Sequence, residues 1–304
     1  MKTGFIDLQV NGHGGVDLLT AKSIEDIRIV SRSMFTSGVI GYLPTVITAP
    51  NEMAVRAIKL IEEVRRDPLP GEAKILGIHL EGPFISRHKC GAHPLINITD
   101  PDMKLMGELL SAGTISMVTL APELPGAINL IEFLSDSGIV VSLGHSNATV
   151  AEANAGFDAG AKTVTHIWNA MGKPGALVPG VGEAALARSD IQIQMIVDKV
   201  HLPLDLIEST IRKSHGRFIV TNDPVAPAGV GEGRFRFGEM LIEVQDGVAR
   251  KMDGTLAGGV GLLTESYQIL EGIGIEESEI LASMTTRPAS LIGYDYDEIA
   301  SEYS

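Results

Sequence analysis

The chain has 304 residues, 44% of them hydrophobic and 20% charged, which is an ordinary balance for a soluble protein with a sizeable core. A formal net charge of −14 argues against a nucleic-acid or an anionic-membrane partner. Cys90 is the single cysteine, which excludes an intrachain disulfide framework; with no signal-peptide pattern and no apolar run of membrane-spanning length, we expect a cytoplasmic protein.

Short apolar runs alternate with amphipathic segments along most of the chain. The apolar runs are nearly continuous, which is typical of parallel strands covered on both faces. We expect strands at 4–10, 38–47, 73–81, 114–121, 139–145, 162–168, 191–198 and 217–223. Helical periodicity predicts helices at 23–36, 51–66, 101–112, 126–137, 149–159, 203–215, 261–273 and 276–291.

This alternation predicts an α/β fold, a (β/α)8 TIM barrel, in one domain spanning residues 1–304. A doubly wound open sheet is the alternative, because periodicity alone does not show whether a sheet closes. Residues 234–252 interrupt the pattern with alternating arginine and phenylalanine and an Asp246-Gly247 turn. We interpret them as a hairpin inserted after the eighth strand.

The polar exceptions in these apolar runs fall at the strand ends, where TIM barrels carry their active sites. Glu81 ends the third strand, in the segment ILGIHLEGPF, and Asp223 ends the eighth. His145 and His166 end the fifth and the sixth. Each of these residues taken alone is more simply a hydrogen-bonded rim residue or a cap. Together, two imidazoles and a carboxylate with an open position form a ligand set typical of catalytic zinc, which could also hold iron, manganese or cobalt.

A metal would explain Glu81, because a buried carboxylate is costly unless it is paired, protonated or metal-bound. A divalent ion activates water near neutral pH, and Asp223 could carry the proton of that water to a leaving amine. His201 follows the seventh strand and could polarise a substrate carbonyl. The set suits metal-assisted hydrolysis of an amide or a related C–N bond. The sequence has no GxSxG, Walker A or CxxC motif to support serine-hydrolase, NTPase or redox chemistry.

A series of motifs spans residues 4–293, in the order GFIDLQVNGHGG, HLEGPF, GAHP, GHSNAT, THIWNAM, DKVH and NDPVAPAG. In this combination and order they resemble the N-acetylglucosamine-6-phosphate deacetylase family of the amidohydrolase superfamily. The resemblance implies that Glu81, His145 and His166 bind one divalent metal, with zinc the first expectation. It also implies that Asp223 is the catalytic acid/base and that His201 contacts the acetyl carbonyl of the substrate.

The resemblance further implies a pocket for a small N-acetylated amino sugar. The positions that match its lining are Ala92, His93, Asn169, Ala170, His201 and, near the acetyl methyl, Leu256. Gln9-Val-Asn11 stands where many superfamily members carry His-x-His, as in the single-metal branch, so one metal per chain is expected. A homodimer is plausible on the same ground.

Three departures from the family pattern bear on the prediction. The chain begins at the first barrel strand and stops just after RPASLIG, so we expect it to lack the small β-sandwich domain that the family builds from both chain ends. Leu177 stands where the family has an arginine that grips the phosphate; Lys173, Arg87 or Lys89 could substitute for it. Lys199 stands where glycine is usual.

These observations predict a metal-dependent deacetylase that hydrolyses the N-acetyl amide of an amino sugar, by default N-acetylglucosamine-6-phosphate to glucosamine-6-phosphate and acetate. The first alternative, favoured by Leu177 and by the expected lack of the sandwich domain, is a related amidohydrolase acting on a different N-acyl amine, which need not be phosphorylated, or on a cyclic amide. The second is a catalytically silent binding protein, against which the intact ligand set and Asp223 both argue.

Overall fold

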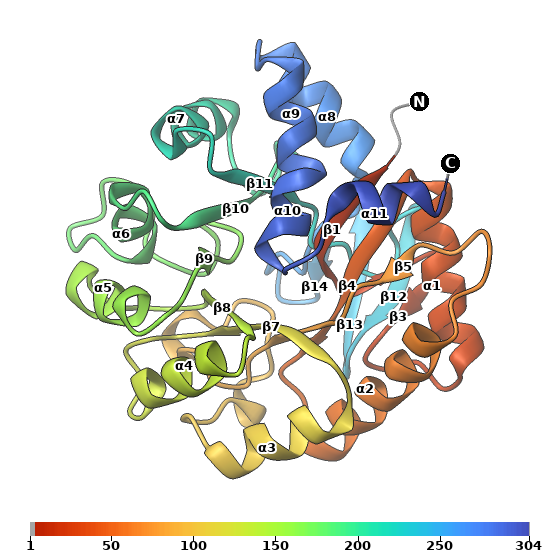
Figure 1. Cartoon of the computed structure of the whole chain (residues 1–304), viewed down its shortest axis with the longest axis horizontal. Coiled ribbons are helices and arrows are strands. Elements are labelled where there is room, and N and C mark those ends of the chain that lie inside the picture. Colours follow the sequence, from red (N-terminus) through yellow and green to blue (C-terminus); the bar gives the residue numbers. More distant parts are fainter. Residues whose placement is uncertain (1–3, 304) are drawn as a thin grey trace.

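A computed structural model describes residues 4–303, in which eight parallel strands follow one another around a barrel (Figure 1). Neighbouring strands pair in chain order and in the parallel sense. The strands are β1 (Phe5–Val10), β4 (Val39–Ile47), β6 (Ile78–Glu81), β7 (Ile115–Leu120), β8 (Val140–Leu143), β9 (Thr163–Val164), β10 (Gln192–Ile196) and β11 (Phe218–Thr221).

A helix follows each of these strands and packs outside the barrel (Figure 1). The helices are α1 (Ile24–Thr36), α2 (Asn51–Arg66), α3 (Met103–Ala112), α4 (Ala127–Asp136), α5 (Val150–Asp158), α6 (Val181–Ala187), α7 (Leu204–Ser214) and α8 (Leu263–Gly272), followed by α9 (Glu277–Met284), α10 (Thr286–Leu291) and α11 (Tyr296–Ser301). Since β1 and β11, the two ends of the strand order, also lie in contact, the sheet is a nearly closed barrel. The predicted (β/α)8 barrel is confirmed, and the open-sheet alternative is wrong.

Two predicted elements differ from the structure, and one helix was not predicted. The strand expected over 73–81 is divided into β5 (Lys74–Ile75) and β6, with Gly77 between them at a φ of 135° that side-chain-bearing residues rarely adopt. The helix expected over 276–291 is two helices, α9 and α10, separated at Thr285. Helix α6 has no counterpart among the predicted elements, because its seven residues are too few for helical periodicity to stand out.

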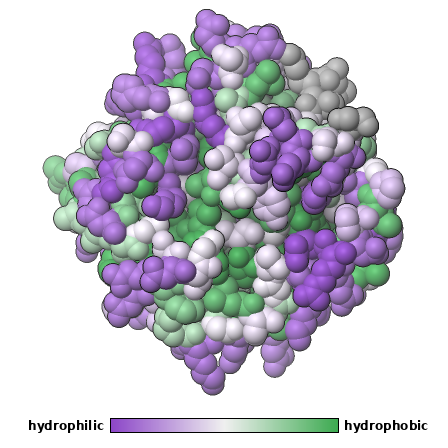
Figure 2. All heavy atoms as spheres, viewed as in Figure 1, coloured by the Kyte–Doolittle hydropathy of each residue, from purple (hydrophilic) through white to green (hydrophobic). Residues whose placement is uncertain are grey.

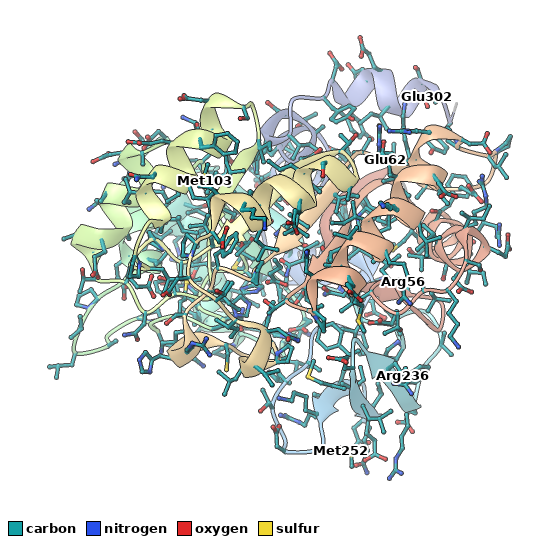
Figure 3. The ribbon with its side chains drawn as sticks, turned by 90° about the horizontal axis from the view of Figure 1, so that it is seen from below. Arg56, Glu62, Met103, Arg236, Met252 and Glu302 are labelled. Atoms are coloured by element: carbon teal, nitrogen blue, oxygen red, sulfur yellow. The ribbon has the colours of Figure 1, made fainter. Side chains whose placement is uncertain are left out.

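The insertion after the last barrel strand is larger than the predicted hairpin. It is a three-stranded antiparallel sheet of β12 (Gly233–Phe237), β13 (Met240–Gln245) and β14 (Val248–Lys251). The turn at Asp246-Gly247 joins β13 to β14 as predicted. Figure 3 shows this sheet, marked by Arg236 and Met252, at the end of the molecule opposite Glu302, which follows α11. A short ribbon of β2 (Gly12–His13) and β3 (Val16–Asp17) and two 3-10 turns, η1 (Arg87–Lys89) and η2 (Leu95–Asn97), complete the elements.

Apolar side chains fill the barrel interior near the N-terminal ends of the strands. Ala289 of α10 and Ile299 of α11 belong to this cluster and cover it at the N-terminal end of the barrel. Its other members are Ile6, Leu8, Ile40, Leu43, Leu76, Met117 and Ile219. On the face drawn in Figure 2, hydrophilic side chains surround apolar ones toward the centre. Among the described residues, no helix has the length and apolar character needed to cross a membrane. Because apolar side chains fill the N-terminal end of the barrel, polar side chains are found at the opposite end, where the strands finish.

Candidate active site

The predicted site residues meet in one pocket at the C-terminal ends of the barrel strands. The pocket has a volume of about 290 Å³, and its lining includes Glu81, Ala92, His93, His145, His166, Asn169, Ala170, His201, Asp223 and Leu256. Glu81 is the last residue of β6, and the other titratable residues lie on loops that leave later strands or β6 itself. Every residue expected to bind metal or substrate or to take part in catalysis is thus brought to the same cavity.

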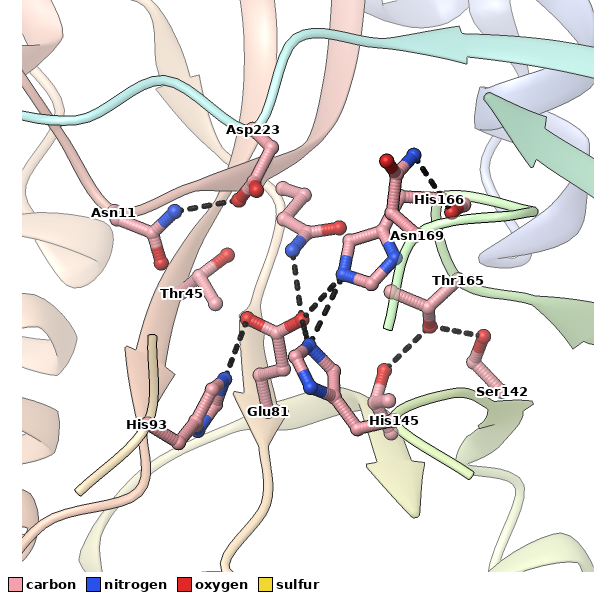
Figure 4. A network of polar contacts seen from close by, with 12 residues as sticks. Asn11, Thr45, Glu81, His93, Ser142, His145, Thr165, His166, Asn169 and Asp223 are labelled. Atoms are coloured by element: carbon pink, nitrogen blue, oxygen red, sulfur yellow. Dashed lines mark hydrogen bonds and ion pairs between the residues drawn. The ribbon is translucent and has the colours of Figure 1, made fainter. Parts of the chain in front are cut away.

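Three atoms able to bind a metal converge in this pocket (Figure 4). Oε1 of Glu81 lies 3.1 Å from Nε2 of His145 and 3.0 Å from Nε2 of His166, and the two ring nitrogens are 3.2 Å apart. Ligands held tetrahedrally by zinc at about 2.1 Å lie roughly 3.4 Å from one another. The observed spacings are close to that value, so the three atoms match the donor set of such an ion.

The protonation of His145 supports the same reading. Its Nδ1 lies 2.9 Å from the carbonyl oxygen of Lys89, which can only accept a hydrogen bond, so Nδ1 carries a proton and Nε2 is the nitrogen available to a metal. In the tautomer that binds a metal, the lone pair on Nε2 faces the carboxylate of Glu81. Acceptor atoms in such close contact repel one another unless a proton or a cation lies between them. Two imidazole nitrogens and a carboxylate oxygen are also the chemistry that zinc prefers.

His93 offers a second way to complete a metal site. Glu81, His93 and His145 each present a ligand atom within 4.8 Å of the other two. Nε2 of His93, however, lies 3.6 Å from Oε2 of Glu81, the carboxylate oxygen that does not face the other imidazoles. The Nδ1 atom of His93 is also hydrogen-bonded to Oγ1 of Thr48, at 2.8 Å. The set with the tighter spacing is Glu81, His145 and His166.

The charge state of the pocket suits metal binding. Burial alone would raise the pKa of Glu81, but the imidazoles of His145, His166 and His93 that lie against its carboxylate outweigh burial and hold this pKa well below its usual value. Burial, with the neighbouring His145, lowers the pKa of His93 to about 4. Gln9 donates from Nε2 to Oε1 of Glu81 at 2.9 Å and so fixes the carboxylate. A carboxylate that stays anionic is the form of Glu81 that binds a cation.

Asp223 faces the pocket from the loop after β11. Asn11 donates from Nδ2 to Oδ1 of Asp223 at 2.6 Å. Burial, followed by the charge of Glu81, raises the pKa of Asp223 well above its usual value. A carboxylate with a raised pKa is a stronger base, so it can take up a proton and later deliver it as a general acid. The backbone of Asp223 also packs against glycine, since a Cβ on Gly258 would lie 2.8 Å from its carbonyl oxygen.

Strained backbone conformations gather around this pocket. Left-handed φ angles are rare outside glycine and are typical of active sites. The described pocket residues that adopt them are His145 (47°), His166 (29°), Trp168 (72°), Ala170 (48°) and Asp223 (49°). Lys199, in the loop after β10, has a φ of 62°. This angle gives a physical reason for the glycine that the family usually has at that position.

His201 is oriented by an aspartate that the sequence marks only as a polar strand end. Nδ1 of His201 lies 2.6 Å from Oδ2 of Asp198, and the backbone N–H of His201 donates to Oδ1 of Asp198 at 2.9 Å. These bonds fix the ring. Burial alone would raise the pKa of Asp198, but the hydrogen bonds from His201 outweigh burial and lower this pKa. The three-residue spacing within DKVH is the signal that could have revealed the pair.

The loop after β9 places its cationic and apolar residues differently from the family expectation. Leu177, at the position of the family arginine, is fully exposed and outside the pocket lining, whereas Lys173 is part of that lining. Arg87 donates its guanidinium hydrogens to the carbonyl oxygens of Leu95 and Ile98. Of the three substitute cations suggested by the sequence, only Lys173 is thus seen at the pocket among the described residues.

Several functional neighbours were missed from the sequence. Trp168 and Phe237 are buried aromatic residues that line the pocket, and Phe237 comes from the inserted sheet. His79, two residues before Glu81, starts a buried chain of hydrogen bonds that leads toward His166. Its Nε2 lies 2.7 Å from Oγ1 of Thr119, which lies 2.6 Å from Oγ1 of Thr165, next to His166. The alternating Arg-Phe pattern and the histidine of HLEGPF were the available signals.

Comparison with known proteins gives a consistent result. No family model matches the chain. The N-acetylglucosamine-6-phosphate deacetylase of Lysinibacillus sphaericus is 31% identical over 290 residues, covering 94% of this chain and 74% of that enzyme. The enzyme of that name from Haemophilus influenzae is 33% identical over 301 residues, covering 97% of this chain and 77% of the other.

Solved structures agree with these relatives. N-acetyl-D-glucosamine-6-phosphate deacetylase of Mycobacterium smegmatis, as a mutant in complex with N-acetyl-D-glucosamine-6-phosphate, superposes with a TM-score of 0.90 at 30% identity, covering 96% of this chain and 78% of that one. The Pasteurella multocida enzyme superposes with a TM-score of 0.87 at 33% identity, covering 96% and 77%. A dihydroorotase at 14% identity and a TM-score of 0.55 shares the fold alone. The chain therefore belongs to the N-acetylglucosamine-6-phosphate deacetylase family.

Proposed function

We propose that this chain is a metal-dependent deacetylase that hydrolyses N-acetylglucosamine-6-phosphate to glucosamine-6-phosphate and acetate. The observation that carries the proposal is the convergence of Glu81, His145 and His166 within 3.0–3.2 Å of one another, in the same pocket as Asp223. Membership of a family whose relatives carry this name supports the substrate. A solved relative with N-acetyl-D-glucosamine-6-phosphate bound supports it as well.

For the cofactor, we propose one divalent cation held by Glu81, His145 and His166, with zinc favoured by the donor chemistry. Iron, manganese and cobalt are compatible with the same donors. When bound, the cation supplies Lewis acidity, which polarises an amide carbonyl and makes water a stronger acid. Gln9, hydrogen-bonded to Glu81, and Asn11, hydrogen-bonded to Asp223, are neutral amides already engaged with site carboxylates, which supports a single metal.

Asp223 and His201 carry the remaining steps in this proposal. Asp223 takes the proton of the attacking water and later delivers it to the leaving amine nitrogen, which its raised pKa favours. His201, oriented through Nδ1 by Asp198, contacts the acetyl carbonyl oxygen, where negative charge develops. Leu256 contacts the acetyl methyl group, and Trp168 limits the access of water to the cavity.

The sugar and its phosphate occupy the remainder of the pocket. We assign the sugar to Ala92, His93, Asn169 and Ala170, and the phosphate to Lys173, whose ammonium can make charge-assisted hydrogen bonds. The exposure of Leu177 favours a second candidate, a related amidohydrolase whose N-acyl amine substrate has no phosphate.

Localisation and oligomeric state stay predictions. The single cysteine, Cys90, is the basis for expecting a reducing, cytoplasmic compartment. The family resemblance is the basis for expecting a homodimer, which sedimentation can check.

The test is acetate release from N-acetylglucosamine-6-phosphate by the purified, zinc-loaded chain, with Asp223→Asn as the matched variant. The variant should keep about one equivalent of metal, because Asp223 is not a ligand in this assignment. Its turnover should fall by roughly 100- to 10,000-fold, the usual loss of a general acid–base group. Unchanged turnover would remove Asp223 from the mechanism, and loss of metal would move Asp223 into the ligand set.

A further inference from the structure

Asp7 is a buried carboxylate at the seam where the barrel closes. It lies on β1, and the described strands show no backbone ladder between β1 and β11 across that seam. The side chain of Asp7 makes the connection instead. Its Oδ1 accepts the hydroxyl hydrogen of Thr221 at 2.5 Å, and its Oδ2 accepts the backbone N–H of Asn222 at 3.3 Å. Thr221 and Asn222 are the two residues that immediately precede Asp223.

The same carboxylate holds an irregularity in β1. Oδ1 of Asp7 also accepts the backbone N–H of Gln9 at 3.2 Å, a turn that aspartate commonly makes. The pairing register of β1 with β4 shifts between Asp7 and Val10, as at a β-bulge, and bulges re-aim side chains next to active sites. Gln9, within the shift, and Asn11, just after it, reach the two site carboxylates with their side-chain amides.

Asp223 occupies a conformation that depends on such support. Its φ of 49° lies in the left-handed region, which persists in a non-glycine residue only where the surroundings impose it. Asp7 fixes the residue before it. The carbonyl oxygen of Pro224, the residue after it, accepts from the backbone N–H of Asn11 at 2.9 Å and from that of Gly12 at 3.1 Å. Asp223 is thus held from both sides, by Asp7 of β1 and by the two residues that follow β1.

We propose that Asp7 is a positioning residue: it ties β1 to the end of β11 and so keeps the Asp223 carboxylate aimed into the pocket. The proposal rests on the proposed function of Asp223 as acid/base. The three donors that face Asp7 are neutral, although a buried carboxylate is costly without a cationic partner. A neutral side chain would therefore suit the fold better, which points to positioning and not to stability as the reason for a charge at this seam.

Two variants separate positioning from folding. Asp7→Asn replaces one carboxylate oxygen with a donor that faces the Asn222 N–H, and Thr221→Val replaces only the hydroxyl, with a methyl group of similar size. Ser283→Ala, which deletes an equally buried hydroxyl in α9, is the control for lost packing. We expect kcat for N-acetylglucosamine-6-phosphate to fall roughly 10- to 100-fold in both variants, with KM within about twofold and metal content unchanged. Ser283→Ala should retain wild-type kcat. A kcat within twofold of wild type in Thr221→Val would overturn the proposal, whatever Asp7→Asn does.

Crystal structures of the same two variants test the proposal without reference to turnover. Displacement of the Asp223 carboxylate or departure of its backbone from the left-handed region is the expected result. An Asp223 in an unchanged position in both variants would overturn the positioning role. If the wild-type chain releases no acetate, the proposed function fails, and the structures still decide whether Asp7 holds Asp223.

Discussion

Asn11 donates a hydrogen bond from Nδ2 to Oδ1 of Asp223 at 2.6 Å, although 212 residues separate the two along the chain. The bond engages one oxygen of the carboxylate and leaves Oδ2 for proton transfer. It also explains an amide in the position where many superfamily members have a histidine ligand, since a donor to Asp223 is needed there.

Replacing Asn11 with leucine, which has a similar shape and no donor, should lower kcat. A hydrogen bond to a charged group contributes about 1.5–3 kcal/mol, so a loss of roughly 10-fold or more is expected, with metal content unchanged. Steady-state kinetics and metal analysis of Asn11→Leu check this. Loss of metal with unchanged kcat per metal-loaded site would instead make Asn11 a ligand.

The ligand assignment predicts different outcomes for two histidines in the same pocket. His166→Asn should leave metal content well below one equivalent per chain, because it removes one of three close donors. His93→Asn should retain the metal and raise KM, since His93 faces the outer oxygen of Glu81. Metal analysis after dialysis against a weak chelator distinguishes them. The reverse pattern would transfer the third ligand from His166 to His93.

Lys173 should control the use of a phosphorylated substrate. Lys173→Met removes the cation at the pocket and should lower kcat/KM for N-acetylglucosamine-6-phosphate about tenfold or more, while N-acetylglucosamine is unaffected. Lys199→Met is the charge-matched control, because Lys199 is exposed and does not line the pocket. Equal effects of the two changes on the phosphorylated substrate would show that the charge acts at long range and not by contact.

The pH dependence of stability should differ between the wild type and Asp7→Asn. Burial raises the pKa of Asp7 to about 6, against 3.8 for an ordinary aspartate. Above pH 6 the folded protein keeps a charge that costs up to about 3 kcal/mol to bury. As the pH falls from 6 toward 4, the folded state binds a proton that the unfolded chain does not, and this cost disappears.

The free energy of unfolding of Asp7→Asn minus that of the wild type should therefore be more positive at pH 7.5 than at pH 4.5. Urea titrations of both proteins at the two pH values measure the difference. A difference that does not change with pH would mean that Asp7 has an ordinary pKa in the folded protein.

Much of this architecture could be predicted because its causes are local. Continuous apolar runs mark the parallel strands, and barrel sites lie at strand C-termini, so the sequence alone predicts that Glu81, His145, His166 and Asp223 meet. The bonds from Asp7 and Asn11 to β11 and its loop could not be predicted, because they depend on a register shift in β1 that has no sequence signature. The exposure of Leu177 likewise depends on how a loop folds, which periodicity does not report.

The most direct test of the proposed deacetylase activity compares kcat/KM for N-acetylglucosamine-6-phosphate and for N-acetylglucosamine, using the zinc-loaded protein and an assay for acetate. We expect release of acetate from the phosphorylated sugar, with a clear preference for it over the unphosphorylated one. A fully metal-loaded protein that releases acetate from neither sugar would contradict the proposed function.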